Sequence, residues 1–498
     1  MQSALSSTTP MTFSYYDLDF FSQWCWKDDP DHKPNADFHR EIYEILQYKG
    51  ELGEKFRETH RLHIEAPRYH AKTTAISVKY VLWRIGRNPN IRVVVISRTG
   101  ALSQDINREV RRNIENNPRY QRVFPEIEPD SPWGDERFQV KRSKIMKDAT
   151  FYGTGLEGSV TGIRADLLIL DDPFDLNNVM TEGQREKVRN WIESVTVSIL
   201  PPSGEMICVG TRWHEDDYWG TLLSKSVEND GNWVCKVYTA IENYEDPPEK
   251  WRLLWPEAWT WETLVQRRED IGSLRFKSLY QNDPSGLSGA LFKHDWLTFY
   301  DPLIMTPEFT QNFDYVMGVD PAISESPEAD RTAIARIAHD VDRGDIYVLD
   351  MYADRHDFPS QVKLIEEWAL RRPLPNIQLG GRIRKVGIEA NAYQQALSKT
   401  AYIRMLPVIE VRQKKNKDAR MLGLQPHFEN GRIKFPDPRY GASSWWEQFQ
   451  DEYLAYPRGR HDDMMDALQL AFEMVDPDRA SDTRTFEFGP PLGYPWKY

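Results

Sequence analysis

Two groups of residues in this chain could do chemistry on phosphates, and they lie in different halves of the sequence. The first half contains segment 68–74, with Lys72 followed by Thr73, and later the acidic pair Asp171 and Asp172. Such a loop and such a pair are typical of a site for a nucleoside triphosphate and Mg²⁺. The second half supplies a spaced set of acids, each beside an apolar strand or at the start of a helix: Asp320, Asp330, Glu389, Asp462, Asp463 and Asp466.

The first loop departs from the standard phosphate loop, G-x-x-x-x-G-K-[ST], because alanines stand at both glycine positions, Ala66 and Ala71. Apolar residues predict a short strand at 63–66 and a helix at 73–85. The loop would then lie at a helix N-terminus, where free N–H groups and the helix dipole favour phosphate. The alternative interpretation is a basic turn that caps a helix. The nucleotide-binding candidates are Pro67, Arg68, Tyr69, His70, Ala71, Lys72, Thr73, Thr74, Asp171 and Thr211.

Each part of this site has an expected role. Lys72 would contact the β- and γ-phosphates, Thr73 would hold Mg²⁺, and Arg68 would add positive charge near the γ-phosphate. The acids follow four apolar residues at 167–170, at the end of a predicted strand. Asp171 would orient a water molecule on Mg²⁺, and Asp172 would polarise the attacking water. The alternative for this pair is an acidic turn after a core strand.

Two further features could complete the site. Thr211 follows a predicted strand at 206–209, so it can lie beside the γ-phosphate and report its loss; an ordinary polar turn fits equally well. A catalytic arginine could come from Arg164 or Arg142, including in trans from a neighbouring subunit.

The acids of the second half fit metal-dependent cleavage of phosphodiesters. Such cleavage needs several carboxylates that converge on two Mg²⁺ or Mn²⁺ ions about 3.5–4 Å apart. Asp320 and Glu389 follow predicted strands, and Asp330 precedes another. In a final helix predicted at 462–475, the pairs Asp462/Asp466 and Asp463/Asp466 each share a face. The alternative is that single acids here cap turns, and that Asp462 and Asp463 suit a helix dipole.

Basic residues lie between these acids and are candidates for contacts with nucleic-acid phosphates, although charge runs are usually solvated surface. They are Arg382, Arg384, Lys385, Arg412, Lys414, Lys415, Lys417 and Arg420.

Composition limits the class of protein. The chain has 498 residues, 28% of them charged, and a net charge of −13. This balance argues against non-specific coating of DNA, although a local basic surface would suffice for binding. No apolar run approaches the ~20 residues that a membrane span needs, and we expect no secretory signal. Three scattered cysteines (Cys25, Cys208 and Cys235) are expected to be buried thiols in a reducing compartment.

Strands that alternate with helices predict an α/β protein with a mostly parallel sheet in its first half. We expect strands at 91–97, 167–170 and 206–209, and helices at 37–48 and 101–116. Residues 1–35 are expected to be an irregular aromatic adaptor segment. In the second half we expect strands at 316–320, 332–337, 346–351 and 386–389, and a helix at 359–371.

The order of these motifs resembles the large terminase subunit of tailed bacteriophages over residues 39–475. The stretches that carry the resemblance are 67–73, 169–173, 209–214, 276–284, 318–322, 417–425 and 459–468. The resemblance implies an N-terminal RecA-like P-loop ATPase with a lid subdomain and a C-terminal ribonuclease-H-like nuclease. The expected domains are therefore an adaptor (1–35), an ATPase core (36–240), a lid and linker (241–312), a nuclease (313–475) and a flexible tail (476–498).

The resemblance also implies a function. A large terminase uses ATP to translocate double-stranded DNA into a procapsid through a portal protein, and it cuts the DNA at the start and end of packaging. The implied partners are the portal, a small terminase subunit and further copies in a ring, commonly a pentamer. The implied location is the host cytoplasm and, transiently, the procapsid, but neither the mature virion nor a membrane. Asp320, Glu389 and Asp462 map to the nuclease triad, with Asp463 and Asp466 nearby.

Two other functions remain open at this point. A helicase–nuclease of recombination or repair would need a second RecA-like domain. A nucleotide-gated DNA-binding scaffold with inactive sites would account for the alanines in the phosphate loop and for aspartate, rather than the more usual glutamate, at Asp172.

Overall fold

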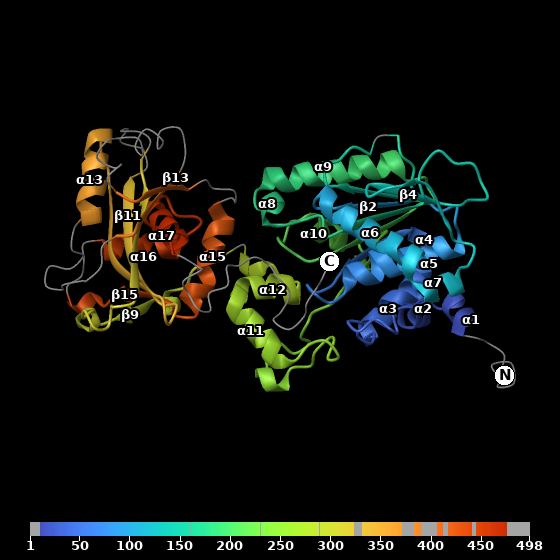
Figure 1. Cartoon of the computed structure of the whole chain (residues 1–498), viewed down its shortest axis with the longest axis horizontal. Helices are drawn as coiled ribbons and strands as arrows, with labels where there is room; N and C mark the ends of the chain where they lie inside the picture. Colours follow the sequence, from blue (N-terminus) through green and yellow to red (C-terminus); the bar gives the residue numbers. More distant parts are fainter. Residues whose placement is uncertain are drawn as a thin grey trace. The chain divides into compact units, whose positions relative to one another are not determined.

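A computed structural model describes the chain except at residues 1–9, 161, 230, 288, 323–330, 371–382, 390–405, 412–416, 441–444 and 476–498. Asp330, the basic residues Arg382, Arg412, Lys414 and Lys415, and the predicted tail lie outside the described residues. The chain divides into two compact units, Met1–Gly289 and Ala290–Tyr498, shown in blue to green and in yellow to red in Figure 1. The boundary falls inside the segment expected to contain the lid and linker. No helix in the described ranges is long and apolar enough to cross a membrane.

The first unit is built on an eight-stranded sheet with the order β3-β4-β5-β2-β6-β7-β1-β8. From β5 to β8 all neighbours are parallel, and β3 and β4 add antiparallel strands at one edge. Strand β7 lies between β1, which precedes the phosphate loop, and β6, which ends at the acidic pair. The strands are β1 (Arg61–Glu65), β2 (Val93–Ser97), β3 (Pro129–Trp133), β4 (Arg137–Val140), β5 (Phe151–Gly155), β6 (Leu167–Asp171), β7 (Glu205–Gly210) and β8 (Val234–Val237).

The insertion of β7 between β1 and β6 is the additional-strand arrangement expected for a RecA-like ATPase core. Because parallel strands have their carboxyl ends on the same side of the sheet, the segments that follow β1, β6 and β7 must meet on that side. The helices of this unit are α1 (Pro10–Tyr16), α2 (Leu18–Cys25), α3 (Asp37–Leu46), α4 (Gly50–Thr59), α5 (Val81–Arg87), α6 (Gly100–Asn116), α7 (Pro118–Val123), α8 (Leu176–Val179), α9 (Glu182–Ile199), α10 (Tyr218–Ser224), α11 (Trp261–Ile271) and α12 (Ser273–Gln281), with the π-helix η2 (Thr74–Tyr80) before α5.

One expectation about local structure was wrong. The N-terminal segment is helical rather than irregular: Asp17 caps α2 by accepting from the Phe20 N–H, and Leu18, Phe21 and Cys25 are buried. Two half-buried aromatic side chains on the other faces of α2, Phe20 and Trp24, obscured its helical pattern. The helix expected at 73–85 is confirmed; its first turns form the π-helix η2, and it continues as α5 to Arg87. Over two turns the two periods differ too little for an apolar pattern to separate them. Cys25 and Cys208 are buried free thiols and Cys235 is half-buried.

The second unit is a seven-stranded mixed sheet with the order β14-β13-β10-β11-β12-β15-β9. Strands β10, β11 and β12 are consecutive and antiparallel, whereas β13 and β14 join the other side of β10 in parallel. This is the ribonuclease-H-like order. The elements are β9 (Thr298–Tyr300), β10 (Phe313–Asp320), β11 (Thr332–Asp340), β12 (Ile346–Asp354), β13 (Lys385–Glu389), β14 (Val408–Val411), β15 (Ile433–Pro436), α13 (Phe358–Leu370), α15 (Lys417–Glu429), α16 (Trp446–Ala455) and α17 (Asp463–Glu473).

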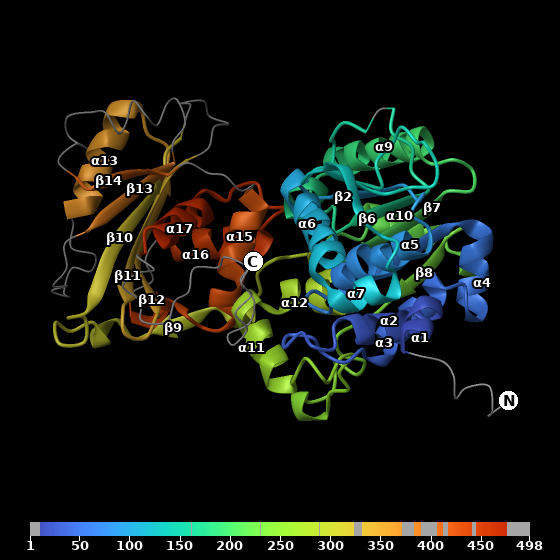
Figure 2. The same ribbon diagram turned by 45° about the vertical axis from the view of Figure 1, so that its right-hand side comes forward.

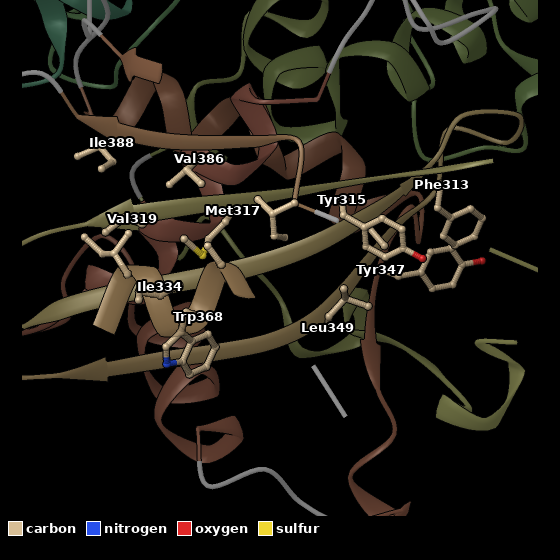
Figure 3. Close-up of a cluster of buried hydrophobic side chains, with 14 of the residues drawn as sticks. Phe313, Tyr315, Met317, Val319, Ile334, Tyr347, Leu349, Trp368, Val386 and Ile388 are labelled. Carbon is tan, nitrogen blue, oxygen red and sulfur yellow. The ribbon is translucent and has the colours of Figure 1, made fainter. Parts of the chain in front are cut away.

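Alternation along β10 assigns its two faces. Odd-numbered residues from Phe313 to Val319 join a buried cluster with Ile388 of β13 and Trp368 of α13 (Figure 3). The even-numbered Gly318 faces α17, on the opposite side of the sheet (Figure 2): a Cβ added to it would overlap the α17 backbone. Since side chains alternate between faces, Asp320 shares the face of Gly318. The same parity places Glu389 on the α17 side of β13.

Candidate functional site

The candidate phosphate loop begins at the carboxyl end of β1. Although alanines replace both glycines of the standard motif, the loop backbone adopts conformations that glycine usually supplies. Ala71 has φ +55° and Tyr69 has φ +60°, so the backbone takes left-handed conformations of the kind glycine favours. Ala66 is not among the residues with positive φ; it is buried and donates its N–H to the Gly210 carbonyl at 3.1 Å. Only the second glycine position therefore has a conformational need for glycine.

The loop and the acidic pair are joined by direct contacts. Lys72 Nζ lies 2.8 Å from Asp172 Oδ2, and Thr73 Oγ1 donates to Asp171 Oδ1 at 2.8 Å. Ser77 of η2 donates to the other oxygen of Asp171. Burial raises the pKa of Asp171 to about 6, with a further contribution from the Asp172 charge, while the hydrogen bonds from Ser77 and Thr73 oppose the rise. The basic loop and the acidic pair therefore contact each other directly and are not two isolated turns.

Thr211 reaches the same site because β7 lies between β1 and β6. Its N–H donates to Asp172 Oδ1 at 3.2 Å, and its buried hydroxyl has no hydrogen-bond partner. The helix α12 connects to both loops: the Arg68 N–H donates to the Leu279 carbonyl at 2.9 Å, and the Arg212 N–H donates to Asn282 Oδ1 at 3.2 Å. A shift of the loop at Arg68 or of the loop at Arg212 would therefore change hydrogen bonds at the carboxyl end of α12.

Other residues of the loop differ in their surroundings. The His70 ring is buried, stacks on Trp259 at 5.5 Å between centroids, and has its pKa lowered to about 4 by burial, so it is neutral near pH 7. It supports the loop from the protein interior. Tyr69 is exposed, and the guanidinium of Arg68 lies 5.4 Å from the ring centre of Trp213.

The two arginine candidates have different positions. Arg142 donates to the carbonyls of Pro89, Asp148 and Ile91, so its guanidinium is committed to holding loops together. Arg164 is exposed and lies before the amino end of β6, whereas the acidic pair lies at the carboxyl end of that strand. With about 3.3 Å per residue, the five residues of β6 put Arg164 too far away to reach phosphates in the site of its own chain.

In the second unit the fold brings together acids that are far apart in sequence. Asp320 ends β10 and Glu389 ends the neighbouring parallel strand β13, with Val319 opposite Ile388 in the register. Burial and the charges of Asp466, Asp463 and Glu389 raise the pKa of Asp320 well above its usual value, while Lys417 opposes the rise. Like charges therefore converge on Asp320, which is the electrostatic condition that a bound cation relieves.

The start of α17 shows what Asp462 does instead of capping. Asp462 precedes the first helical residue, but its side chain makes no capping hydrogen bond. Its Oδ2 lies 2.7 Å from Lys417 Nζ, which also lies 2.5 Å from Asp466 Oδ2. The Met464 N–H is instead capped by Glu452 Oε2 at 2.8 Å. The turn-and-cap alternative for Asp462 is therefore not what the structure has.

Asp463 points into a separate ionic group. Arg331 Nε donates to Asp463 Oδ2 at 3.0 Å, and the same guanidinium binds Glu452 Oε1. Burial raises the pKa of Glu452 to about 7, which the Met464 N–H and Arg331 oppose. Sequence reasoning missed Glu452 and Arg331, as it missed Ser77, because isolated polar residues in helices or before strands carry no motif.

The acids of the second unit fit a divalent metal by charge and by chemistry. Asp466 Oδ1 is buried without a hydrogen-bond partner, and burial raises the pKa of Asp466 to about 6. Among the described residues, no three His, Cys, Asp or Glu side chains are already arranged to hold a metal ion. Lys417 Nζ lies between Asp462 and Asp466, within 2.7 Å of both carboxylates.

Comparisons with known proteins agree with both halves of this picture. Residues 317–475 match the family model described as the terminase RNaseH-like domain. The terminase large subunit of Enterobacteria phage T3 is 25% identical over 172 residues, which cover 33% of this chain and 27% of that protein. The match thus spans about a quarter of the length of this curated relative.

Solved structures extend the likeness to nearly the whole chain. The large terminase of a thermophilic bacteriophage, in its second crystal form, has a TM-score of 0.55 at 10% identity, covering 89% of this chain and 99% of the other. The same protein in complex with ADP has a TM-score of 0.54 at 11% identity, with the same coverage. Residues 317–475 are therefore similar to the terminase RNaseH-like domain family, and the chain shares its fold, over 89% of its length, with the large terminase of a thermophilic bacteriophage.

Proposed function

We propose that this chain is the motor and the nuclease of a phage DNA-packaging machine. Its first unit would hydrolyse ATP to translocate double-stranded DNA, and its second unit would cut that DNA. The observation that carries the proposal is that each unit gathers its acids, together with a lysine, at the carboxyl ends of its strands: Lys72 with Asp172 in one, Lys417 with Asp462 and Asp466 in the other. The ADP complex of the thermophilic bacteriophage's large terminase supports the nucleotide assignment.

In the first unit, residues 67–74 would hold the phosphates of ATP, and Thr73 and Asp171 would hold Mg²⁺, which neutralises phosphate charge. Lys72 would exchange its contact with Asp172 for the β- and γ-phosphates. Asp172, half-exposed and released by Lys72, would then accept a proton from the attacking water. Thr211 touches Asp172 through its N–H and so would sense this change. The anchors of α12 on Arg68 and Arg212 would carry it towards the linker.

In the second unit, Asp320, Glu389, Asp462 and Asp466 would hold Mg²⁺ or Mn²⁺, two ions in our proposal, which activate water and stabilise the leaving oxygen. Asp463 would contribute from its position beside Arg331, and Asp330 remains a candidate ligand. Their strand-end and helix-start positions keep these carboxylates on one face of the sheet, where a DNA backbone can approach.

The proposal includes the assembly that packaging requires. We propose a homo-oligomeric ring, a pentamer, on the portal of a procapsid in the host cytoplasm, with a small terminase subunit that selects the DNA. Arg164 is exposed on the edge opposite its own phosphate loop. That position suits an arginine acting on the site of a neighbouring copy, whereas Arg68 would act within its own chain.

The two other functions fit the structure less well. A helicase–nuclease would place a second parallel RecA-like sheet after the first, but the second unit has the ribonuclease-H-like order with antiparallel β10, β11 and β12. An inactive scaffold would have no reason to keep Lys72 and Thr73 in contact with Asp172 and Asp171.

Reciprocal variants of the full chain test the proposal. Lys72→Ala should lower DNA-stimulated ATP hydrolysis at least about 100-fold and leave Mn²⁺-dependent plasmid cleavage in place. Asp320→Ala should do the reverse, because the two sites lie in different units. Loss of both activities in both variants would argue for one composite site. Full cleavage in EDTA would exclude the metal assignment. Unchanged ATP turnover in Lys72→Ala would show that the phosphate loop lies elsewhere in the sequence.

A further inference from the structure

We propose that Lys417 is a working residue of the nuclease centre, not only a structural ion-pair partner. Its ammonium would occupy a cation position between Asp462 and Asp466 until divalent ions bind, and would then move to a phosphate of the DNA. This inference rests on the proposed nuclease function. It adds a lysine, contributed by the first turn of α15, to a centre otherwise made of acids.

The geometry shows a cation position shared by two carboxylates. Lys417 Nζ lies 2.7 Å from Asp462 and 2.5 Å from Asp466, so the two acids are bridged across one turn of α17. The Lys417 side chain is 38% exposed. It therefore has room to leave the acids without unpacking α15.

Asp462 is free to exchange its partner. Because Glu452 caps α17 at the Met464 N–H, the Asp462 carboxylate has no capping duty to lose. Lys417 is then its one ionic partner among the described residues. Releasing the lysine would leave the helix start intact.

One lysine does not satisfy the charge at this centre. Asp320 faces the charges of Asp466, Asp463 and Glu389, and Lys417 is the cation that opposes them. Asp466 Oδ1 is buried without a partner even with Lys417 in place. Hard dications prefer carboxylate oxygens and carry twice the charge of an ammonium, so they should displace it.

A displaced Lys417 has a chemically suitable destination. Arg420, one turn further along α15, donates to Gln469 of α17 at 3.1 Å, so this face of α15 turns towards α17 and its acids. A DNA strand that brings its phosphate to ions held by Asp462 and Asp466 would pass within reach of the lysine. Lysine contacts phosphate as a mobile point charge, which suits an exchange of partners.

The competing explanation is that Lys417 simply fastens α15 to α17. The two explanations predict opposite effects on metal binding. If the ammonium competes with metal, its removal should tighten binding; if it only fastens the helices, removal should loosen the acids and weaken binding. The ion pair of Lys434 with Asp345 in the same unit provides the matched control, because it joins one lysine to one acid outside the cluster.

The test measures Mn²⁺ binding to the full chain without nucleotide, by calorimetry, for wild type, Lys417→Met and Lys434→Met. Asp466→Asn identifies the part of the isotherm that belongs to the second unit. We expect Lys417→Met to bind Mn²⁺ about tenfold more tightly, equivalent to about 1.4 kcal/mol, and to cleave plasmid DNA at least about tenfold more slowly at saturating Mn²⁺. Lys434→Met should change neither quantity.

Several results would overturn the inference. Equal or weaker Mn²⁺ binding by Lys417→Met would exclude competition, and unchanged cleavage at saturation would exclude the phosphate contact. If circular dichroism shows that Lys417→Met is unfolded, Lys417→Arg replaces it: it should bind Mn²⁺ no more tightly than wild type and retain part of the cleavage. A wild-type chain that binds Mn²⁺ competitively but cuts no DNA would leave the competition standing and refute the proposed nuclease.

Discussion

Lys72 and Lys417 both neutralise paired acids, but they are brought to those acids in different ways. Lys72 meets Asp172 because two short segments follow the parallel strands β1 and β6, which flank β7 and end on the same side of the sheet. Lys417 meets Asp462 and Asp466 only because α15 and α17 pack together. The first centre should therefore be sensitive to the backbone of one loop, and the second to packing between helices and sheet. Substitutions outside the acids themselves test this difference between the two centres.

The largest effect is expected at Glu452, which holds the start of α17 to α16. Glu452→Ala should destabilise the full chain by about 3 kcal/mol or more, because Arg331 loses a buried partner and the Met464 N–H loses its cap. Cleavage should fall with stability, while ATP hydrolysis should persist below the unfolding transition. Glu447→Ala, an exposed position of the same helix, should stay within about 0.5 kcal/mol in a urea titration. Equal midpoints for the two variants would remove Glu452 from the support of this centre.

The same contrast explains what could be predicted from the sequence. Lys72, Thr73, Asp171 and Asp172 lie in two short motifs, and local strand and helix signals sufficed to place them together. The position of Thr211 beside Asp172 depends on β7 lying between β1 and β6.

The second centre shows where such reasoning ends. Its acids were found because each follows a strand or begins a helix. The sequence placed Lys417 in a basic run and in one stretch of the resemblance, but gave it no partner, and it did not indicate Glu452. The partners lie 45 or more residues from Lys417 and 12 or more from Glu452. Contacts across that distance are set by packing, which no local pattern encodes.

A smaller effect is expected at Gly318, where β10 and α17 approach each other. Gly318→Ala should destabilise the chain by about 1–3 kcal/mol, since a Cβ would overlap the backbone of α17 at Ala467 and Ala471. The displacement would also move Asp466 from Asp320 and slow cleavage. Gly423→Ala in α15 is the control: no atom lies within 4 Å of its added Cβ, so it should be neutral or stabilising by up to about 1 kcal/mol. Thermal midpoints decide between them, and a fully stable, fully active Gly318→Ala would refute the close approach.

Both centres contain a carboxyl group whose pKa is raised by burial, so the pH dependence of stability should have the same direction in both. Burial raises the pKa of Asp171 and of Asp466 to about 6 from a usual value of 3.8. The folded state therefore holds these protons more tightly than the unfolded chain, and the stability this gives is present below about pH 4 and lost as pH rises through 6. Between pH 5 and 7.5 in EDTA, the free energy of unfolding should therefore fall as each carboxyl group loses its proton.

Asparagine variants isolate this dependence. Asp171→Asn and Asp466→Asn should each remove the share of the stability loss between pH 5 and 7.5 that belongs to its own carboxyl group, measured as urea midpoints. Mg²⁺ at pH 7.5 should restore the stability of the wild-type second unit but not that of Asp466→Asn. A slope that survives in the double variant would assign the pH dependence to other groups.

The smallest effect is expected at Ala71, and it tests whether the first centre depends on one backbone conformation. At φ +55°, Ala71→Gly relieves about 1 kcal/mol of strain but gains freedom in the unfolded chain, so stability should change by less than about 0.5 kcal/mol and ATP hydrolysis should persist or rise. Ala71→Val places a β-branched residue in the same conformation, where it fits poorly, so ATP hydrolysis should fall while cleavage by the second unit continues. Equal ATPase rates in the two variants would mean that phosphate binding does not depend on the left-handed conformation of residue 71.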